Sequence, residues 1–79
     1  MTKNELRAKW EAHRNELAGA INRDRVKIAN LTTRVQVQGA KTPKGQNYAA
    51  RLRFTRECLA QRVAQLAVID LLLLDVSKW

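Results

Sequence analysis

The chain has 79 residues, a formal net charge of +8, a single cysteine and a single histidine. One cysteine excludes a disulfide within the chain, and one cysteine with one histidine cannot supply the four protein ligands of a structural zinc site. A chain of this size is near the lower limit for a self-sufficient core, so we expect it to bury further apolar surface against a second chain.

No segment of the sequence is expected to cross a membrane. The first eleven residues, MTKNELRAKWE, are polar and charged, unlike a secretory signal. The longest uncharged apolar run, residues 63–69, is too short to span a bilayer. A longer span would bury Asp70 and Asp75 at considerable cost. We therefore expect a cytoplasmic protein without a membrane span.

Residues 3–38 are predicted to form the first of two long helices. Thr2 and Glu5 have the spacing of a capping box, and Met1 and Leu6 have that of a hydrophobic staple. Beyond this start, residues expected to face a partner helix recur every three or four positions, which indicates long helices packed at a shallow angle. They are Leu6, Trp10, His13, Leu17, Ile21, Asp24, Ile28, Leu31 and Val35.

A turn is predicted at residues 39–45 because helix-breaking residues cluster there. Two of the three glycines and the only proline fall within this segment. Thr42 and Pro43 suit the N-cap and the first position of a following helix. The sequence therefore predicts a second helix over residues 43–77.

The leucines of the second helix recur with a period of seven, as in a helix that packs along its length on a neighbour. A short connection makes the two helices antiparallel neighbours. The predicted fold class is therefore all-α, a helical hairpin that forms a single domain over residues 1–79. The expected contact stripe consists of Leu52, Leu59, Leu66 and Leu73, flanked by Tyr48, Thr55 and Val63.

Two aspartates fall on the expected contact stripes, where an isolated carboxylate would be costly. Antiparallel pairing about the turn predicts that the numbers of facing residues sum to about 81. We interpret the aspartates as members of buried ion pairs that fix the register more than they add stability. The expected partner of Asp24 is Arg56, and the candidates for Asp70 are Arg14, His13 and the indole of Trp10.

The C-terminal segment AVIDLLLLDVSKW is apolar almost all the way round a helix. Such a helix is normally buried on all sides, whereas a single facing helix covers only one stripe. We expect a homodimer in which two hairpins form a four-helix bundle. Docking on a different protein is the alternative, and insertion into a membrane surface fits less well. The expected interface residues are Val68, Leu71, Leu72, Leu74 and Trp79.

Positive charge is concentrated in the middle of the sequence. Residues 23–62 contain ten basic residues and two acidic ones, and the segments on either side are nearly neutral. In a hairpin this stretch forms the turn end. Solubility alone is usually achieved with charges of both signs, so we interpret the excess as a polyanion-binding surface. Its candidate residues are Arg23, Lys27, Arg34, Lys41, Lys44, Arg51, Arg53 and Arg62.

The sequence offers little for catalysis. Any triad or dyad with histidine would have to use His13, and Cys58 is expected far from it. Carboxylates are few, and the glycines form no phosphate-binding motif. We therefore expect a protein that is not an enzyme and that has no metal, no cofactor and no small-molecule substrate.

Two non-catalytic functions fit these features. In the first, the hairpin contacts nucleic-acid phosphates through its basic end, without reading base edges, and self-associates through its apolar end. Phe54 and Tyr48 could stack on bases, although Tyr48 is expected in the core. In the second, the chain is a modulator or inhibitor of the kind that phages and other mobile elements encode, and it docks on an acidic surface of a host protein complex. The charge favours the first hypothesis.

Overall fold

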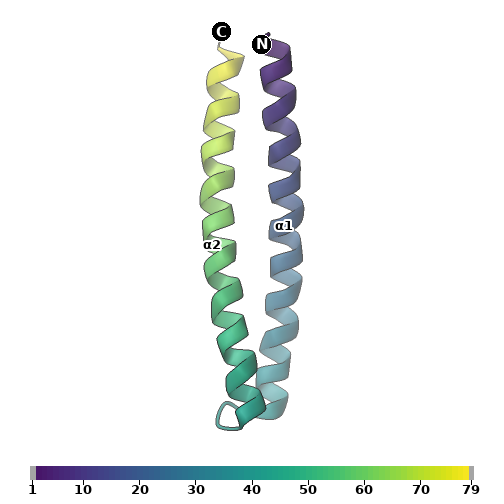
Figure 1. Cartoon of the computed structure of the whole chain (residues 1–79), viewed down its shortest axis with the longest axis vertical. Helices are drawn as coiled ribbons and strands as arrows, with labels where there is room; N and C mark the ends of the chain where they lie inside the picture. The colour runs from purple at the N-terminus through teal and green to yellow at the C-terminus, as the bar shows by residue number, and fades with distance from the viewer. Residues whose placement is uncertain (1, 79) are drawn as a thin grey trace.

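The computed structural model describes residues 2–78 and is a hairpin of two long antiparallel helices (Figure 1). Helix α1 spans Lys3–Gln38 and helix α2 spans Pro43–Ser77, and residues 2–78 contain no strand. The molecule measures 56 × 15 × 14 Å, with both ends of the chain at the same end of the rod. Neither helix, over the described residues, is apolar over a stretch long enough to cross a membrane. The predicted all-α chain of two helices is confirmed.

Both helices begin at a threonine N-cap. The Thr2 hydroxyl oxygen accepts a hydrogen bond from the backbone N–H of Glu5 at 3.1 Å. The Thr42 hydroxyl oxygen accepts from the backbone N–H of Gly45 at 3.0 Å. Each bond satisfies one of the backbone donors that the first turn of a helix leaves without a partner. The expected hydrophobic staple involves Met1, which lies outside the described residues.

The turn between the helices requires glycine at two positions. Gly39 ends α1 with a φ of 84°, a left-handed conformation that favours glycine, and its N–H donates to the Val35 carbonyl at 2.9 Å. Gly45 lies in the first turn of α2, directly against the backbone of Gly39. A Cβ atom at residue 45 would clash with the Gly39 carbonyl oxygen. This close approach fixes where α2 starts relative to the end of α1.

The core is a single seam that runs between the helices. Each helix contributes side chains at alternating steps of three and four residues, the spacing of shallow-angle packing. Asp24 and Thr55 are buried polar residues within it, and the Thr55 hydroxyl donates to the Arg51 carbonyl at 2.8 Å. The buried apolar side chains are Leu17, Ile21 and Leu31 of α1 and Leu52, Ile69 and Val76 of α2.

The seam differs from the predicted stripes at His13 of α1 and at several positions of α2, where Ile69 and Val76 are buried although the predicted stripe did not include them. His13 is exposed, and the next residue, Arg14, is partly buried instead. Val63 is 44% exposed, and Arg62 takes the expected place of Val63 in the seam. The prediction selected the less polar neighbour in both cases. It was wrong because an aspartate across the seam neutralises each arginine.

Two ion pairs cross the seam. Arg62 Nη1 lies 2.5 Å from Asp24 Oδ2, with side chains that are 40% and 10% exposed, respectively. Arg14 Nε lies 2.5 Å from Asp70 Oδ1, with side chains that are 42% and 47% exposed. The expected pairing of Asp24 with Arg56 is wrong, since Arg56 is exposed and Arg62 takes its place. Arg14 and Asp70 form their pair at the surface rather than in the buried core.

The direction of the side chains explains the change of partner. In an α-helix every Cα–Cβ bond leans toward the N-terminus of its own helix. Because α1 and α2 are antiparallel, the side chains of Asp24 and Arg62 lean toward each other along the rod. The side chain of Arg56 leans toward the turn and therefore away from Asp24. The register expected from the turn alone therefore places the α2 partner in each ion pair about one helical turn too close to the turn between the helices.

Candidate functional site

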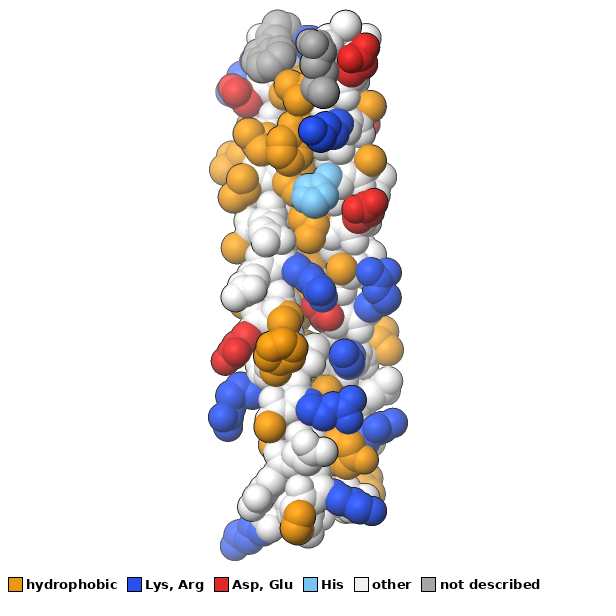
Figure 2. Space-filling view, viewed as in Figure 1, with side chains coloured by type: hydrophobic (Ala, Val, Ile, Leu, Met, Phe, Trp, Pro, Cys, Tyr) orange, Lys and Arg blue, Asp and Glu red, His pale blue; other side chains and the backbone are white. Residues whose placement is uncertain are grey.

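Basic side chains from both helices border one groove in the half of the rod near the turn. Lys27 and Arg34 are seven residues apart, so they lie on one edge of α1. Arg51 and Cys58 are also seven residues apart, and they lie on one edge of α2. Lys27 and Cys58 line the same hollow, which brings the two edges together. Figure 2 shows lysine and arginine side chains gathered over the middle and the turn end of the rod. Lys44 lies seven residues before Arg51 on the same edge of α2. We call Lys27, Arg34, Lys44 and Arg51 the basic face.

Seven of the eight candidate polyanion-binding residues are exposed. The exception is Arg62, whose guanidinium is held by the buried Asp24 carboxylate. A charge-assisted pair of this kind occupies the arginine, so Arg62 is not the free phosphate-binding cation that we expected. The exposed candidates are Arg23, Lys27, Arg34, Lys41, Lys44, Arg51 and Arg53.

Few acidic residues offset this charge. Of the two acids among residues 23–62, Asp24 is paired with Arg62, which leaves Glu57. The stretch of α1 from residue 23 to its end covers about 24 Å of the rod at 1.5 Å per residue. A ligand that lies along this half therefore meets mainly positive charges, which attract anions less strongly as salt is added.

Arg34 is held in place by an aromatic ring. Its Cζ atom lies 5.5 Å from the centroid of the Tyr48 ring, the arrangement of a cation–π contact. Tyr48 is partly buried, so its ring supports Arg34 from below. Sequence reasoning missed this contact. The two residues lie at similar distances from the turn, four residues before the end of α1 and five after the start of α2, and that symmetry is the signal that could have revealed it.

A small hollow of about 110 Å³ lies between the helices near the middle of the rod. Phe54 forms part of its wall and is 67% exposed. The sequence identified Phe54 as a residue that could stack on bases, but it did not place the ring beside Lys27. The residues that line the hollow are Asp24, Lys27, Phe54, Thr55, Cys58 and Arg62.

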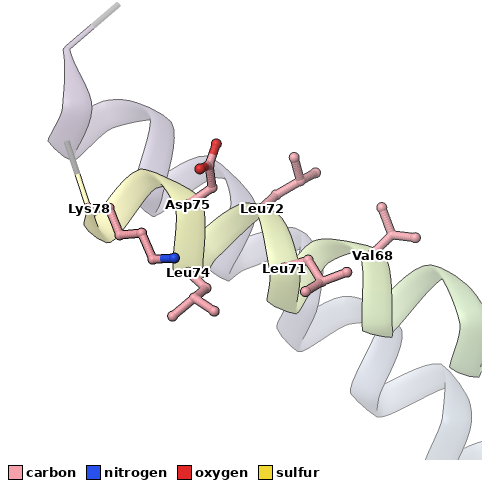
Figure 3. A pocket seen from close by; sticks show the side chains of 6 residues that line it. All are labelled: Val68, Leu71, Leu72, Leu74, Asp75 and Lys78. Atoms are coloured by element: carbon pink, nitrogen blue, oxygen red, sulfur yellow. The ribbon is translucent and has the colours of Figure 1, made fainter.

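The end of the rod that carries the termini has a different surface. Its exposed aliphatic side chains belong to α2 and line a depression of about 420 Å³ together with Asp75 and Lys78 (Figure 3). Trp79, the fifth expected interface residue, lies outside the described residues. We call the other four the apolar patch, and their exposed fractions are 56% for Val68, 67% for Leu71, 37% for Leu72 and 55% for Leu74.

The apolar surface continues from the apolar patch onto the groove between the helices. Val68 and Leu72 also line a second hollow of about 390 Å³, which reaches Trp10 and His13 of α1. The Trp10 and His13 rings meet edge to face, with centroids 6.1 Å apart and an interplanar angle of 63°. The two ends of the rod therefore differ in chemistry, one apolar and the other cationic.

Residues with catalytic or metal-binding chemistry are scattered along the hairpin. Cys58 is a free, partly buried thiol near the middle of α2, whereas His13 is exposed toward the end with the termini. Within residues 2–78, no group of three or more His, Cys, Asp or Glu residues is placed to hold a metal ion. The surfaces with a distinct chemistry of their own are the basic face, the hollow beside Phe54 and the apolar end.

Comparisons of the chain with protein-family models, with curated proteins and with solved structures gave no match. The two most distinctive surfaces of the described residues are the cationic half of the rod and the apolar patch at its other end.

Proposed function

We propose that this protein is a non-catalytic nucleic-acid-binding hairpin whose basic half contacts phosphates and whose apolar end joins two copies of the chain. The observation that carries the proposal is the separation of charge along the rod. Seven exposed candidate cations lie in the half near the turn, where Glu57 is the acid left without a partner across the seam. A surface of this kind attracts a phosphate backbone and binds it by releasing counterions.

The identity of the cations supports phosphate as the ligand. Seven of the ten basic residues among residues 23–62 are arginine, whose planar guanidinium suits hydrogen bonding to phosphate oxygens. Arg34 is already oriented by the Tyr48 ring and loses less freedom on binding than a mobile side chain would. The Arg34–Tyr48 contact therefore supports a binding role for the basic face.

The dimensions of the rod favour contacts with the nucleic-acid backbone. Its cross-section of 15 × 14 Å exceeds the width of the major groove of B-DNA, which is about 12 Å. The paired helices therefore do not enter the groove together. Phosphate contacts of this kind position a protein without reading base edges, so we expect weak dependence on sequence.

The apolar patch supports self-association as the second part of the proposal. Leu71 and Leu74 are each more than half exposed in the hairpin. Packing two patches together would form a four-helix bundle and remove these side chains from water. A dimer also carries two basic faces, so its affinity for a long nucleic acid exceeds that of one hairpin through avidity.

The proposal is tested by removing charge from the basic face. In the variant Lys27→Gln/Arg51→Gln, two exposed side chains lose their charge, and we expect the helices to stay intact. We expect the slope of log K against log salt for duplex DNA to become shallower by about 2, because each lost phosphate contact removes about one unit. Fluorescence anisotropy across a salt series measures this slope.

The matched control is Arg7→Gln/Lys9→Gln, which removes the same charge from the other half of the rod. We expect its slope to equal that of the unmodified protein. Equal slopes for the two double variants would show that net charge alone attracts the nucleic acid, and the proposed basic face would then be wrong. Circular dichroism verifies that both variants keep their helix content.

A further inference from the structure

Phe54 is an exposed aromatic residue that neither the core nor the apolar patch explains. Its side chain is 67% exposed and lies beside Lys27 and Arg62. The apolar patch begins at Val68, fourteen residues further along α2, which is about 21 Å away along the helix axis. An exposed aromatic ring beside cations is the combination with which single-strand-binding proteins stack bases and hold phosphates.

The polar groups of the adjacent hollow are already engaged. Asp24 Oδ2 accepts from Arg62 Nη1 at 2.5 Å, and the Thr55 hydroxyl donates to a backbone carbonyl at 2.8 Å. The Asp24–Arg62 pair makes the floor of the hollow close to neutral. The free charge is at the rim, on Lys27. A neutral floor with an aromatic wall suits a nucleobase, whereas the cationic rim suits its phosphate.

We propose that the basic face binds single-stranded nucleic acid, with one base stacked on Phe54 and the adjoining phosphate at Lys27. The strand then continues along the groove toward Arg34 and Arg51, where further phosphates are held. This inference rests on the proposed function and specifies its ligand. A duplex keeps its bases stacked inside and offers phosphates alone, whereas a single strand can place an unstacked base on an aromatic ring.

The test compares Phe54→Ala with Phe54→Trp for binding to a single-stranded oligothymidine and to a duplex of the same length. We expect the alanine variant to bind the single strand about 5- to 150-fold more weakly, the range that one lost stacking contact produces. Its duplex affinity should change by less than about twofold, because duplex binding depends on phosphate contacts. The tryptophan variant should retain single-strand binding, since the larger ring also stacks.

The matched control is Val26→Ala, which removes an apolar side chain of similar exposure, 62%, from α1. We expect it to bind both nucleic acids as the unmodified protein does. Since Phe54 is largely exposed, its replacement should leave the thermal unfolding midpoint nearly unchanged, and this excludes unfolding as the cause of weaker binding.

The outcomes separate this inference from the proposed function. If Phe54→Ala leaves single-strand binding unchanged, or weakens single-strand and duplex binding equally, while binding stays salt-dependent, the stacking site is wrong and the phosphate-binding face stands. If the unmodified protein binds neither nucleic acid, both proposals are wrong. Selective loss of single-strand binding in Phe54→Ala, with rescue by Phe54→Trp, supports the stacking site.

Discussion

Asp24 is the residue at which the hairpin is most sensitive to the loss of a partner. The residue is 7% exposed, and Arg62 supplies its hydrogen bond across the seam. Truncating the partner of a buried charge costs far more than replacing both residues with apolar ones, because only the first change leaves a charge without compensation. The pair therefore specifies which residues face each other along the helices.

Replacement of Arg62 tests this pairing at the scale of single residues. We expect Arg62→Leu to lower the free energy of unfolding by about 1–3 kcal/mol, a value reduced from that of fully buried pairs because Arg62 is 40% exposed. The double variant Asp24→Leu/Arg62→Leu should regain most of this loss. Urea denaturation measures all three proteins.

Arg56→Leu is the control for the register. Arg56 is exposed, and we expect its replacement to change the unfolding free energy by less than about 0.5 kcal/mol. A larger loss in Arg56→Leu than in Arg62→Leu would mean that Asp24 pairs with Arg56, which would contradict the register of the structure.

At the scale of the elements, the turn determines how the two helices meet. Thr42 caps α2 and also donates to the Gly39 carbonyl at 3.0 Å, so one side chain ties the two sides of the turn together. Gly45 allows the first turn of α2 to lie against Gly39 without a side chain between them. A residue inserted at this contact moves the start of α2 and with it every pair along the seam.

Gly45→Ala is expected to destabilise the hairpin by at least about 2 kcal/mol, since its Cβ would clash with backbone that cannot move away without shifting the turn. Gly19→Ala is the matched control in the interior of α1. There the new Cβ would lie 3.5 Å from Arg23 Nη1, an ordinary contact, so alanine should stabilise the helix by about 0.5–1 kcal/mol. Equal effects of the two substitutions in urea denaturation would contradict the close contact at the turn.

Local signals predict the elements of this protein better than they predict its contacts. Thr2, Thr42 and Pro43 mark the helix starts in the sequence because capping depends on the nearest few residues. The choice of Arg62 over Arg56 as the partner of Asp24 depends on side-chain direction, which residue spacing does not contain.

The candidate site also has features that the sequence predicts and features that it does not. The cationic half could be predicted because it follows from composition and from the existence of a turn. The stacking of Arg34 on Tyr48, and the hollow that joins Phe54 to Lys27, depend on how the edges of the two helices are brought together. Near the turn, the symmetry of Arg34 and Tyr48 could have revealed their contact, whereas the hollow at Phe54 requires a register that residue spacing alone does not give.

At the scale of the whole molecule, the rod joins an apolar end to a cationic end. The segregation would let the proposed self-association and the proposed phosphate binding use separate surfaces. A dimer formed through the apolar patch would leave both basic faces free. Loss of the dimer should therefore weaken binding to a long nucleic acid while leaving the contacts of each hairpin unchanged.

Leu71→Gln/Leu74→Gln tests the self-association. Both side chains are more than half exposed in the hairpin, so the substitutions should keep the helix content and raise the dimer dissociation constant at least about tenfold. The control Val26→Gln/Val37→Gln changes exposed apolar residues outside the apolar patch and should leave the dimer intact. Sedimentation equilibrium measures the masses, and an unmodified protein that stays monomeric would show that this patch does not join two copies.

The proposal that the basic half binds nucleic-acid phosphates is tested by the salt dependence of binding of the unmodified protein. Anisotropy titrations with single-stranded DNA, duplex DNA and structured RNA across a salt series provide it. We predict a linear fall of log K with log salt, with a slope that corresponds to several phosphate contacts, and binding that persists for one of the three at about 0.15 M salt. Uniform weak binding that is lost for all three by that salt concentration would contradict the claim and would direct attention to an acidic protein surface as the partner.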